Sequence, residues 1–270
     1  MEILKPILNK PALRKIGLNK PSLLSAGNPH GGKVKPYIAG HVTDGASTFT
    51  FKVNKTTEIT VPVGNDGNWK WNVDRVITSL ESAFQDITNI DYVEINGKAF
   101  NETQTIYYLF RQSSVINVVI KNTTLDKVAN MYGCFYNTRS LKTVFFESST
   151  FSAVTDNYVF GAFGGSSVKT ISMPNATFDS LESFNLMLYG CASLEDFEIK
   201  EIPLDFSTQY SSKLTEQSVV NIFNAVAADG ITLTFYSTVY AMIQAQLEIE
   251  DSPIYNAYWD SDYDFTIASA

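Results

Sequence analysis

The 270-residue sequence predicts an α/β repeat protein in which a solenoid of parallel strands follows a small antiparallel β module and an extended N-terminal arm. Three observations predict this fold class. An apolar pattern returns every 25–27 residues, alternating apolar residues precede it, and Lys-Pro steps interrupt the N-terminus. The expected order is an arm at 1–36, a β module or N-terminal cap at 37–78, five repeats at 79–206 and an α/β C-terminal cap at 207–270.

The composition favours a folded binding or structural protein over an enzyme. Apolar residues make up 44% of the chain, which is ample for a core, and the 14 Tyr and 18 Phe argue against disorder. No apolar run reaches the roughly 18 residues of a membrane-spanning helix. Two Cys and two His disfavour a disulfide scaffold, a Cys-rich zinc site and most histidine-based catalysis. We therefore expect no enzymatic activity, no metal and no cofactor.

The first 36 residues form a basic arm on an acidic body. They hold seven basic residues and one acidic residue, which leaves 13 basic and 27 acidic residues for the rest. The acidic body disfavours nucleic acid as a partner. Prolines 6, 11 and 21 prevent a continuous helix, and the apolar stretches are too short for a secretory signal. Two interpretations stay open, an unstructured tail and an extended peptide that docks on a partner. The docking residues would be Lys5, Ile7, Leu8, Lys10, Leu13, Arg14, Lys15, Ile16, Leu18 and Lys20.

Alternating apolar residues predict a small β module after the arm. The alternation covers 48–53, 59–63 and 69–73, and turn-forming residues occupy 54–56 and 64–68. Three such strands would form an antiparallel meander. Because a meander of this size is marginal alone, we expect it to pack on the following repeats as a cap.

The main signal is a frame of the form apolar-x-x-apolar-x-apolar that occurs five times. It reads Ile90/Val93/Ile95, Val115/Val118/Ile120, Leu141/Val144/Phe146, Val168/Ile171/Met173 and Leu194/Phe197/Ile199. A large apolar residue follows each frame, at Phe100, Leu125, Phe151, Phe178 and Leu204, and another precedes it, at Phe84, Phe110, Phe135, Phe163 and Leu188. Each frame predicts a short strand whose buried side chains stack on the next coil, closed by a turn or short helix. The period is that of leucine-rich repeats.

Two segments carry a more specific resemblance. Residues 130–141 read NMYGCFYNTRSL and residues 187–194 read MLYGCASL, which resembles the M-F-x-x-C-x-x-L consensus of BspA-like leucine-rich repeats. The resemblance covers 79–206, although Phe replaces Leu at several ladder positions and some repeats lack the Cys. That family occurs in bacterial surface proteins and in proteins of gut bacteria and their phages. The resemblance implies a binding or adhesion module.

The C-terminal segment is expected to cap the open end of the stack. Thr215 is a good N-cap for a helix, and Gly230 would be its C-terminal stop. A strand at 231–235, a second helix from Ser237 to about 247 and a final strand at 264–268 should follow. Phage-encoded relatives of the repeat family end in a similar unit.

The predicted interaction patch lies on the strands. Residues that alternate with the ladder should project from the exposed sheet, where Phe145 beside Val119 would form an exposed apolar spot. This spot is either ordinary surface or an interaction patch. The candidate patch comprises Tyr92, Glu94, Val119, Phe145, Ser172 and Glu198. His41 is expected near a strand edge, and Cys134 and Cys191 are expected as buried free thiols.

Three functions remain open. The first is a non-enzymatic virion protein of a tailed phage, a capsid decoration or a tail fibre, which the arm anchors to other virion proteins. The alternative is a bacterial surface or secreted adhesin that binds host protein or glycan. A glycan hydrolase is the third candidate. It would need paired carboxylates in a cleft, whereas five similar repeats offer a continuous face. Neither nucleic acid nor a membrane span is expected, and association into a homo-oligomer stays open.

Overall fold

The computed structural model describes residues 35–155, 158–184 and 186–270. The arm residues predicted to dock, from Lys5 to Lys20, lie outside this part of the chain. The predicted boundaries after residues 36, 78 and 206 stay predictions. Within the described residues, no helix has the length and apolar character needed to cross a membrane.

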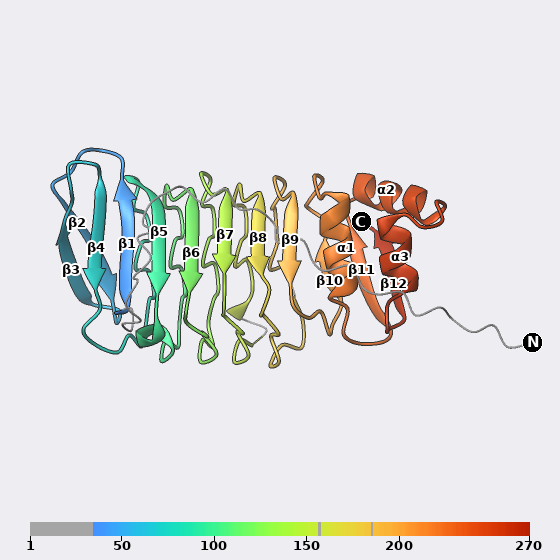
Figure 1. The fold of residues 1–270 in the computed structure, drawn as a ribbon, viewed down its shortest axis with the longest axis horizontal. Helices are drawn as coiled ribbons and strands as arrows, with labels where there is room; N and C mark the ends of the chain where they lie inside the picture. Colours follow the sequence, from blue (N-terminus) through green and yellow to red (C-terminus); the bar gives the residue numbers. More distant parts are fainter. Residues whose placement is uncertain (1–34, 156–157, 185) are drawn as a thin grey trace, which may run out of the picture. The chain divides into compact units, whose positions relative to one another are not determined.

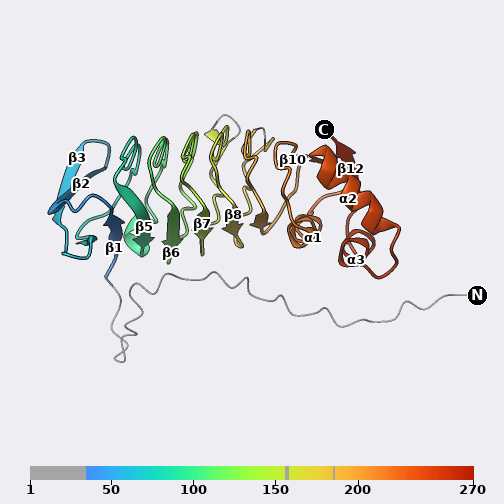
Figure 2. The ribbon, with the colours of Figure 1, turned by 90° about the horizontal axis from the view of Figure 1, so that it is seen from above.

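The centre of the fold is a seven-stranded sheet with the order β4-β1-β5-β6-β7-β8-β9 (Figure 1). Its parallel part consists of β5 (Ile90–Asn96), β6 (Asn117–Lys121), β7 (Thr143–Phe146), β8 (Thr170–Met173) and β9 (Asp196–Ile199). Figure 2 shows these strands along one side of the coils and the connecting turns on the other. The predicted parallel-strand solenoid, of about five turns, is therefore confirmed.

The coils stack in phase because the apolar frame repeats in phase. Val93, Val118 and Val144 are directly opposite one another on successive strands. All the frame residues are buried, and none is more than 5% exposed. No single coil could bury this ladder, since each coil supplies only one layer of it.

A stack of phenylalanine rings runs beside the ladder. Neighbouring rings of Phe84, Phe110, Phe135 and Phe163 have centroids 5.1, 5.3 and 5.2 Å apart and are tilted by no more than 10°. This spacing is close to the separation of neighbouring strands, so each ring is held by the coil before and the coil after. Leu188 takes the corresponding position in the next repeat and is also buried.

Turns close most of the repeats, where a turn or a short helix was expected. The described repeat residues contain no α-helix, and η1 (Lys98–Phe100) is a single 3₁₀ turn. The α-helices α1 (Glu216–Asn224), α2 (Ser237–Leu247) and α3 (Pro253–Trp259) all lie after the repeats. Because helical content is low, the α/β leucine-rich-repeat label is not confirmed for the solenoid and remains a proposal.

Two positions of each turn, four residues apart, adopt a left-handed backbone, and the first of them is a glycine in some coils and a larger residue in others. Gly133 and Gly161 have φ of 55° and 57°, and Tyr108 and Leu186 have φ of 54° and 56° at the corresponding positions. The backbone carbonyl of each of these residues accepts a hydrogen bond from the backbone N–H three residues further along the chain. Glycine adopts this conformation freely, whereas Tyr and Leu do so at a cost of about 1–2 kcal/mol. The turn is therefore imposed by the stacking of the coils.

The N-terminal β module differs from the predicted meander. It contains β1 (Tyr37–Val42), which was not predicted, besides β2 (Thr48–Val53), β3 (Thr57–Pro62) and β4 (Asn68–Asn72). β1 pairs antiparallel with both β4 and β5, while β2 and β3 form a separate hairpin. At Gly40 a Cβ would lie 2.6 Å from the Trp69 ring, so only glycine lets Trp69 pack there. Phe51 continues the ring stack, 5.3 Å from Phe84.

The C-terminal segment agrees with most of its predicted elements. Thr215 accepts a hydrogen bond from the Ser218 amide at 3.2 Å and caps α1, while α2 and the strands β11 (Ile231–Phe235) and β12 (Phe265–Ser269) lie within one residue of their predicted ranges. The strands β11 and β12 form a parallel sheet with β10 (Phe206–Thr208). The prediction that Gly230 ends α1 was wrong, because α1 ends at Asn224. Gly230 instead lies in the turn that leads into β11.

Replacing Phe135 by Ala should lower the free energy of unfolding by about 3–5 kcal/mol, because it leaves a cavity between two stacked rings. Equilibrium urea denaturation measures this loss. The matched control is Phe160→Ala, since Phe160 is 37% exposed and its removal leaves no internal cavity. Equal losses for the two variants would contradict the stacked core.

Candidate functional site

The structure places five of the six predicted strand-face residues in one row. Glu94 is opposite Val119, Val119 opposite Phe145, Phe145 opposite Ser172, and Ser172 opposite Glu198, so the row crosses β5 to β9. Tyr92, the sixth predicted residue, lies in the neighbouring row and bonds to Glu94. The in-phase coils thus align residues from Glu94 to Glu198 in a single row across five strands.

The row is less open than expected. Glu94 and Ser172 are only 9% and 5% exposed, and Val119, Phe145 and Glu198 are half-buried. The Ser172 hydroxyl donates to Glu198 Oε2 at 2.6 Å. The expected exposed apolar spot at Phe145 is therefore a half-buried one, between polar groups that are already paired.

Glu94 is the centre of a partly buried polar cluster. The Tyr37 hydroxyl donates to Oε1, the Tyr92 hydroxyl donates to Oε2 at 2.7 Å, and Lys121 Nζ lies 2.8 Å from Oε1. Burial alone would raise the pKa of Glu94, but the bonds to Lys121, Tyr37 and Tyr92 outweigh it and lower that pKa. Burial raises the pKa of Tyr92, and the bond to Glu94 raises it further. The Glu94 carboxylate is thus held ionised.

These partners come from three different strands. Tyr37 lies on β1, Glu94 and Tyr92 on β5, and Lys121 at the end of β6. The cluster therefore ties the antiparallel β1 to the first coils of the solenoid. Three of the roughly four lone-pair sites of the Glu94 carboxylate are thus occupied, and the three donors hold the carboxylate in one position on this face.

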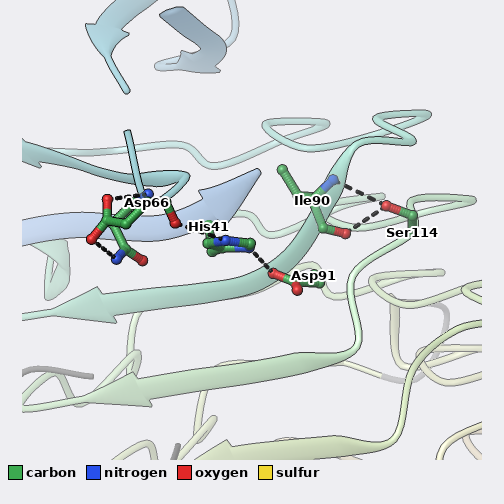
Figure 3. A network of polar contacts seen from close by, with 6 residues as sticks. His41, Asp66, Ile90, Asp91 and Ser114 are labelled. Carbon is green, nitrogen blue, oxygen red and sulfur yellow. Dashed lines mark hydrogen bonds and ion pairs between the residues drawn. The ribbon is translucent and has the colours of Figure 1, made fainter. Parts of the chain in front are cut away.

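His41 links the same β module to the solenoid (Figure 3). Its Nδ1 lies 2.8 Å from Asp91 Oδ1, and its Nε2 lies 3.1 Å from the backbone oxygen of Asp66. Beside them, the Ser114 hydroxyl donates to the Ile90 carbonyl at 2.5 Å and accepts from the Ile90 amide at 3.1 Å. His41 lies one residue from the end of β1, and β1 itself lies between β4 and β5 in the sheet.

A second candidate surface was missed from the sequence. Tyr107, Tyr108, Tyr132 and Tyr158 line a shallow pocket of about 270 Å³. The ring centroids of Tyr107 and Tyr108 are 3.9 Å apart, and each lies within 5.8 Å of Tyr132. These tyrosines belong to the connecting turns and not to the seven-stranded sheet. The sequence does carry a signal for this surface, since Tyr recurs at 107–108, 132 and 158 with nearly the period of the repeat.

An arginine lies beside this tyrosine pocket. The Arg111 guanidinium carbon is 4.5 Å from the centroid of the Tyr108 ring. Its Nε is buried and has no hydrogen-bond partner, and none of the ion pairs in the described part of the chain involves Arg111. The Tyr107 hydroxyl raises the pKa of Tyr108 most, followed by burial, and Arg111 opposes that shift.

The remaining polar groups with unusual chemistry are thiols. Cys134 and Cys191 are buried and form no disulfide, as predicted. Burial raises the pKa of both, that of Cys191 to about 12, so both are held as neutral thiols. Across the described residues, no three His, Cys, Asp or Glu side chains are grouped in a way that could hold a metal ion.

Comparison of the chain with protein-family models, with curated proteins and with solved structures finds no match.

Replacing Glu94 by Gln should lower the free energy of unfolding by about 2 kcal/mol at pH 7, because charge-assisted bonds from Lys121 and two phenols are weakened. The pKa of Glu94 is lowered in the fold, so this stabilisation is present above its ordinary value of 4.5 and is lost as the pH falls through the folded value. Urea denaturation at pH 7 and pH 3 should thus show a difference between wild type and variant that shrinks at pH 3.

The control for this experiment is Glu102→Gln. Glu102 pairs with Lys127 at 2.6 Å, but both side chains are about half exposed. Exposed ion pairs contribute little to the free energy of unfolding, so this variant should unfold like the wild type at both pH values. A Glu94→Gln variant that also unfolds like the wild type would show that the buried cluster does not stabilise the fold.

Proposed function

We propose that this chain is a non-enzymatic structural and binding protein of the BspA-like leucine-rich-repeat kind, carried on the virion of a tailed phage. Its arm would anchor it to other virion proteins, and its coils would present a surface to a protein or to the host. The observation that carries the proposal is the row of residues that crosses five in-phase strands, since a continuous face of this kind suits an extended partner.

The chemistry of the face supports binding more than catalysis. Its most buried carboxylate, Glu94, already accepts bonds from three donors, and Glu198 accepts from Ser172. Catalytic carboxylates need a free lone pair or a mobile proton toward a substrate. Val119 and Phe145 give the centre of the row an apolar character, which favours contact with a partner.

The charge distribution supports the role of the arm. Seven basic residues and one acidic residue in 1–36 oppose an acidic remainder of the chain. An arm of this charge would be attracted to an acidic groove on a neighbouring subunit, and the interspersed Leu and Ile would supply apolar contacts.

A bacterial surface or secreted adhesin is the second candidate. The tyrosine pocket favours it, because exposed tyrosines are typical of surfaces that contact ligands. Mass spectrometry of purified phage particles and of host envelope fractions separates the two candidates. The virion proposal predicts this chain in particles at a fixed copy number. Its absence from particles and presence in the envelope fraction would favour the adhesin.

Deleting residues 1–34 should abolish incorporation into particles and leave the rest folded. The truncated chain keeps Pro36, whose carbonyl accepts from the Val73 amide at 2.8 Å, so β1 retains its support. Circular dichroism melting checks folding, and immunoblotting of purified particles checks incorporation. Full-length Phe145→Asp is the comparison variant, since it alters the strand face and keeps the arm. Normal incorporation of the truncated chain would rule out anchoring by the arm.

A further inference from the structure

The tyrosine pocket and Arg111 together have the chemistry of a ligand site. We propose that Tyr107, Tyr108, Tyr132 and Tyr158, with Arg111, bind an acidic carbohydrate, one whose sugar ring carries a carboxylate. The inference does not depend on whether the chain is carried on a virion or on a cell surface. It rests on the aromatic walls of the pocket, on an arginine that lies against one of them and forms no ion pair within the described residues, and on the way the coils hold both.

The walls of the pocket suit a sugar ring. A pyranose has an apolar face of C–H groups and a rim of hydroxyls, and a tyrosine offers an apolar ring with a hydroxyl at its end. The pocket, of about 270 Å³, is shallow and formed by four such rings. Tyr158 is 45% exposed, so one wall is directly accessible from solvent. A wholly apolar partner would cover the tyrosine hydroxyls and remove their hydrogen bonds to water.

Arg111 supplies the charge selectivity. Its guanidinium lies over Tyr108, a wall of the pocket, and forms no ion pair within the described residues. Its Nε is buried without a hydrogen-bond partner, so contact with a ligand is assigned to the two Nη groups at the end of the side chain. A carboxylate matches the planar donor fork of arginine better than a neutral hydroxyl does. A cationic ligand is disfavoured, because Arg111 already lies against one of the rings.

The stacking of coils holds the site in place. A Cβ at Gly133 would lie 2.6 Å from Cε1 of Tyr108, so the Tyr108 ring fills the space that this glycine leaves in the next coil. Tyr132 in turn stacks on Phe160 of the following coil, with centroids 5.6 Å apart. The aromatic surface therefore extends along the solenoid, and a carbohydrate chain could contact more than one coil.

Isothermal titration calorimetry on the purified full-length chain tests the proposal. The acidic probes are trigalacturonic acid and 3′-sialyllactose, and the neutral probes are galactotriose and lactose. At least one acidic probe should bind about tenfold or more tightly than its neutral counterpart. Tyr158→Ala and Arg111→Gln should each weaken that binding about tenfold, and added salt should weaken it further.

The matched control is Tyr210→Ala. Tyr210 is also an exposed tyrosine, 37% accessible, and packs on Tyr189 with centroids 4.8 Å apart, outside the pocket. It should leave affinity unchanged, and the melting temperature of every variant confirms folding. Absence of binding by both acidic probes at millimolar concentration would overturn the proposal. Equal binding of acidic and neutral probes, or equal losses in Tyr158→Ala and Tyr210→Ala, would overturn it as well.

Discussion

The structure depends on one constraint, that each coil buries its apolar ladder only against the next coil. Strand pairing sets the coil spacing, and the stacked rings of Phe84, Phe110 and Phe135 follow that spacing. Because the coils are in phase, whatever projects from one strand is opposite its counterpart on the next. The continuous strand face and the run of tyrosines on the turns are both consequences of this constraint.

The same constraint explains the two ends of the solenoid. An open end would expose the ladder, so each end needs a different structure to cover it. At the first coil, Phe51 and Trp69 pack on Phe84, and the cluster around Glu94 fixes β1 in register. After the last coil, Phe206 stacks on Phe197 with centroids 5.3 Å apart and continues the core toward α1 and the parallel C-terminal sheet.

Much of the fold could be predicted from the sequence, because periodicity is a local pattern that repeats. The frames around Val93, Val118 and Val144 placed the parallel strands correctly, and Thr215 placed the start of α1. β1 was missed, since its Ala39 and Gly40 lack the bulk of a typical strand. The glycine is explained by two groups distant in sequence, the Trp69 ring and the Tyr92 carbonyl, which would both clash with a Cβ.

The candidate site was harder to predict, because its geometry also depends on residues that are distant in the sequence. Spacing indicated that Glu94 would project from the strand face, but its burial depends on Tyr37, a residue 57 positions away. The tyrosines of the pocket lie on turns, and no apolar period marks them. Tyr108 even adopts a left-handed backbone that its own preference disfavours, so its position follows from the neighbouring coil.

A double-mutant cycle between Phe110 and Phe135 tests the shared core most directly. The two rings are parallel, 5.3 Å apart and on successive coils, while Phe178 lies further along the solenoid and has no ring contact with Phe110. Free energies of unfolding of the Ala variants should give a coupling of about 0.5–1.5 kcal/mol for Phe110 and Phe135. For Phe110 and Phe178 the losses should add within about 0.5 kcal/mol. Additive losses for the stacked pair would contradict the account.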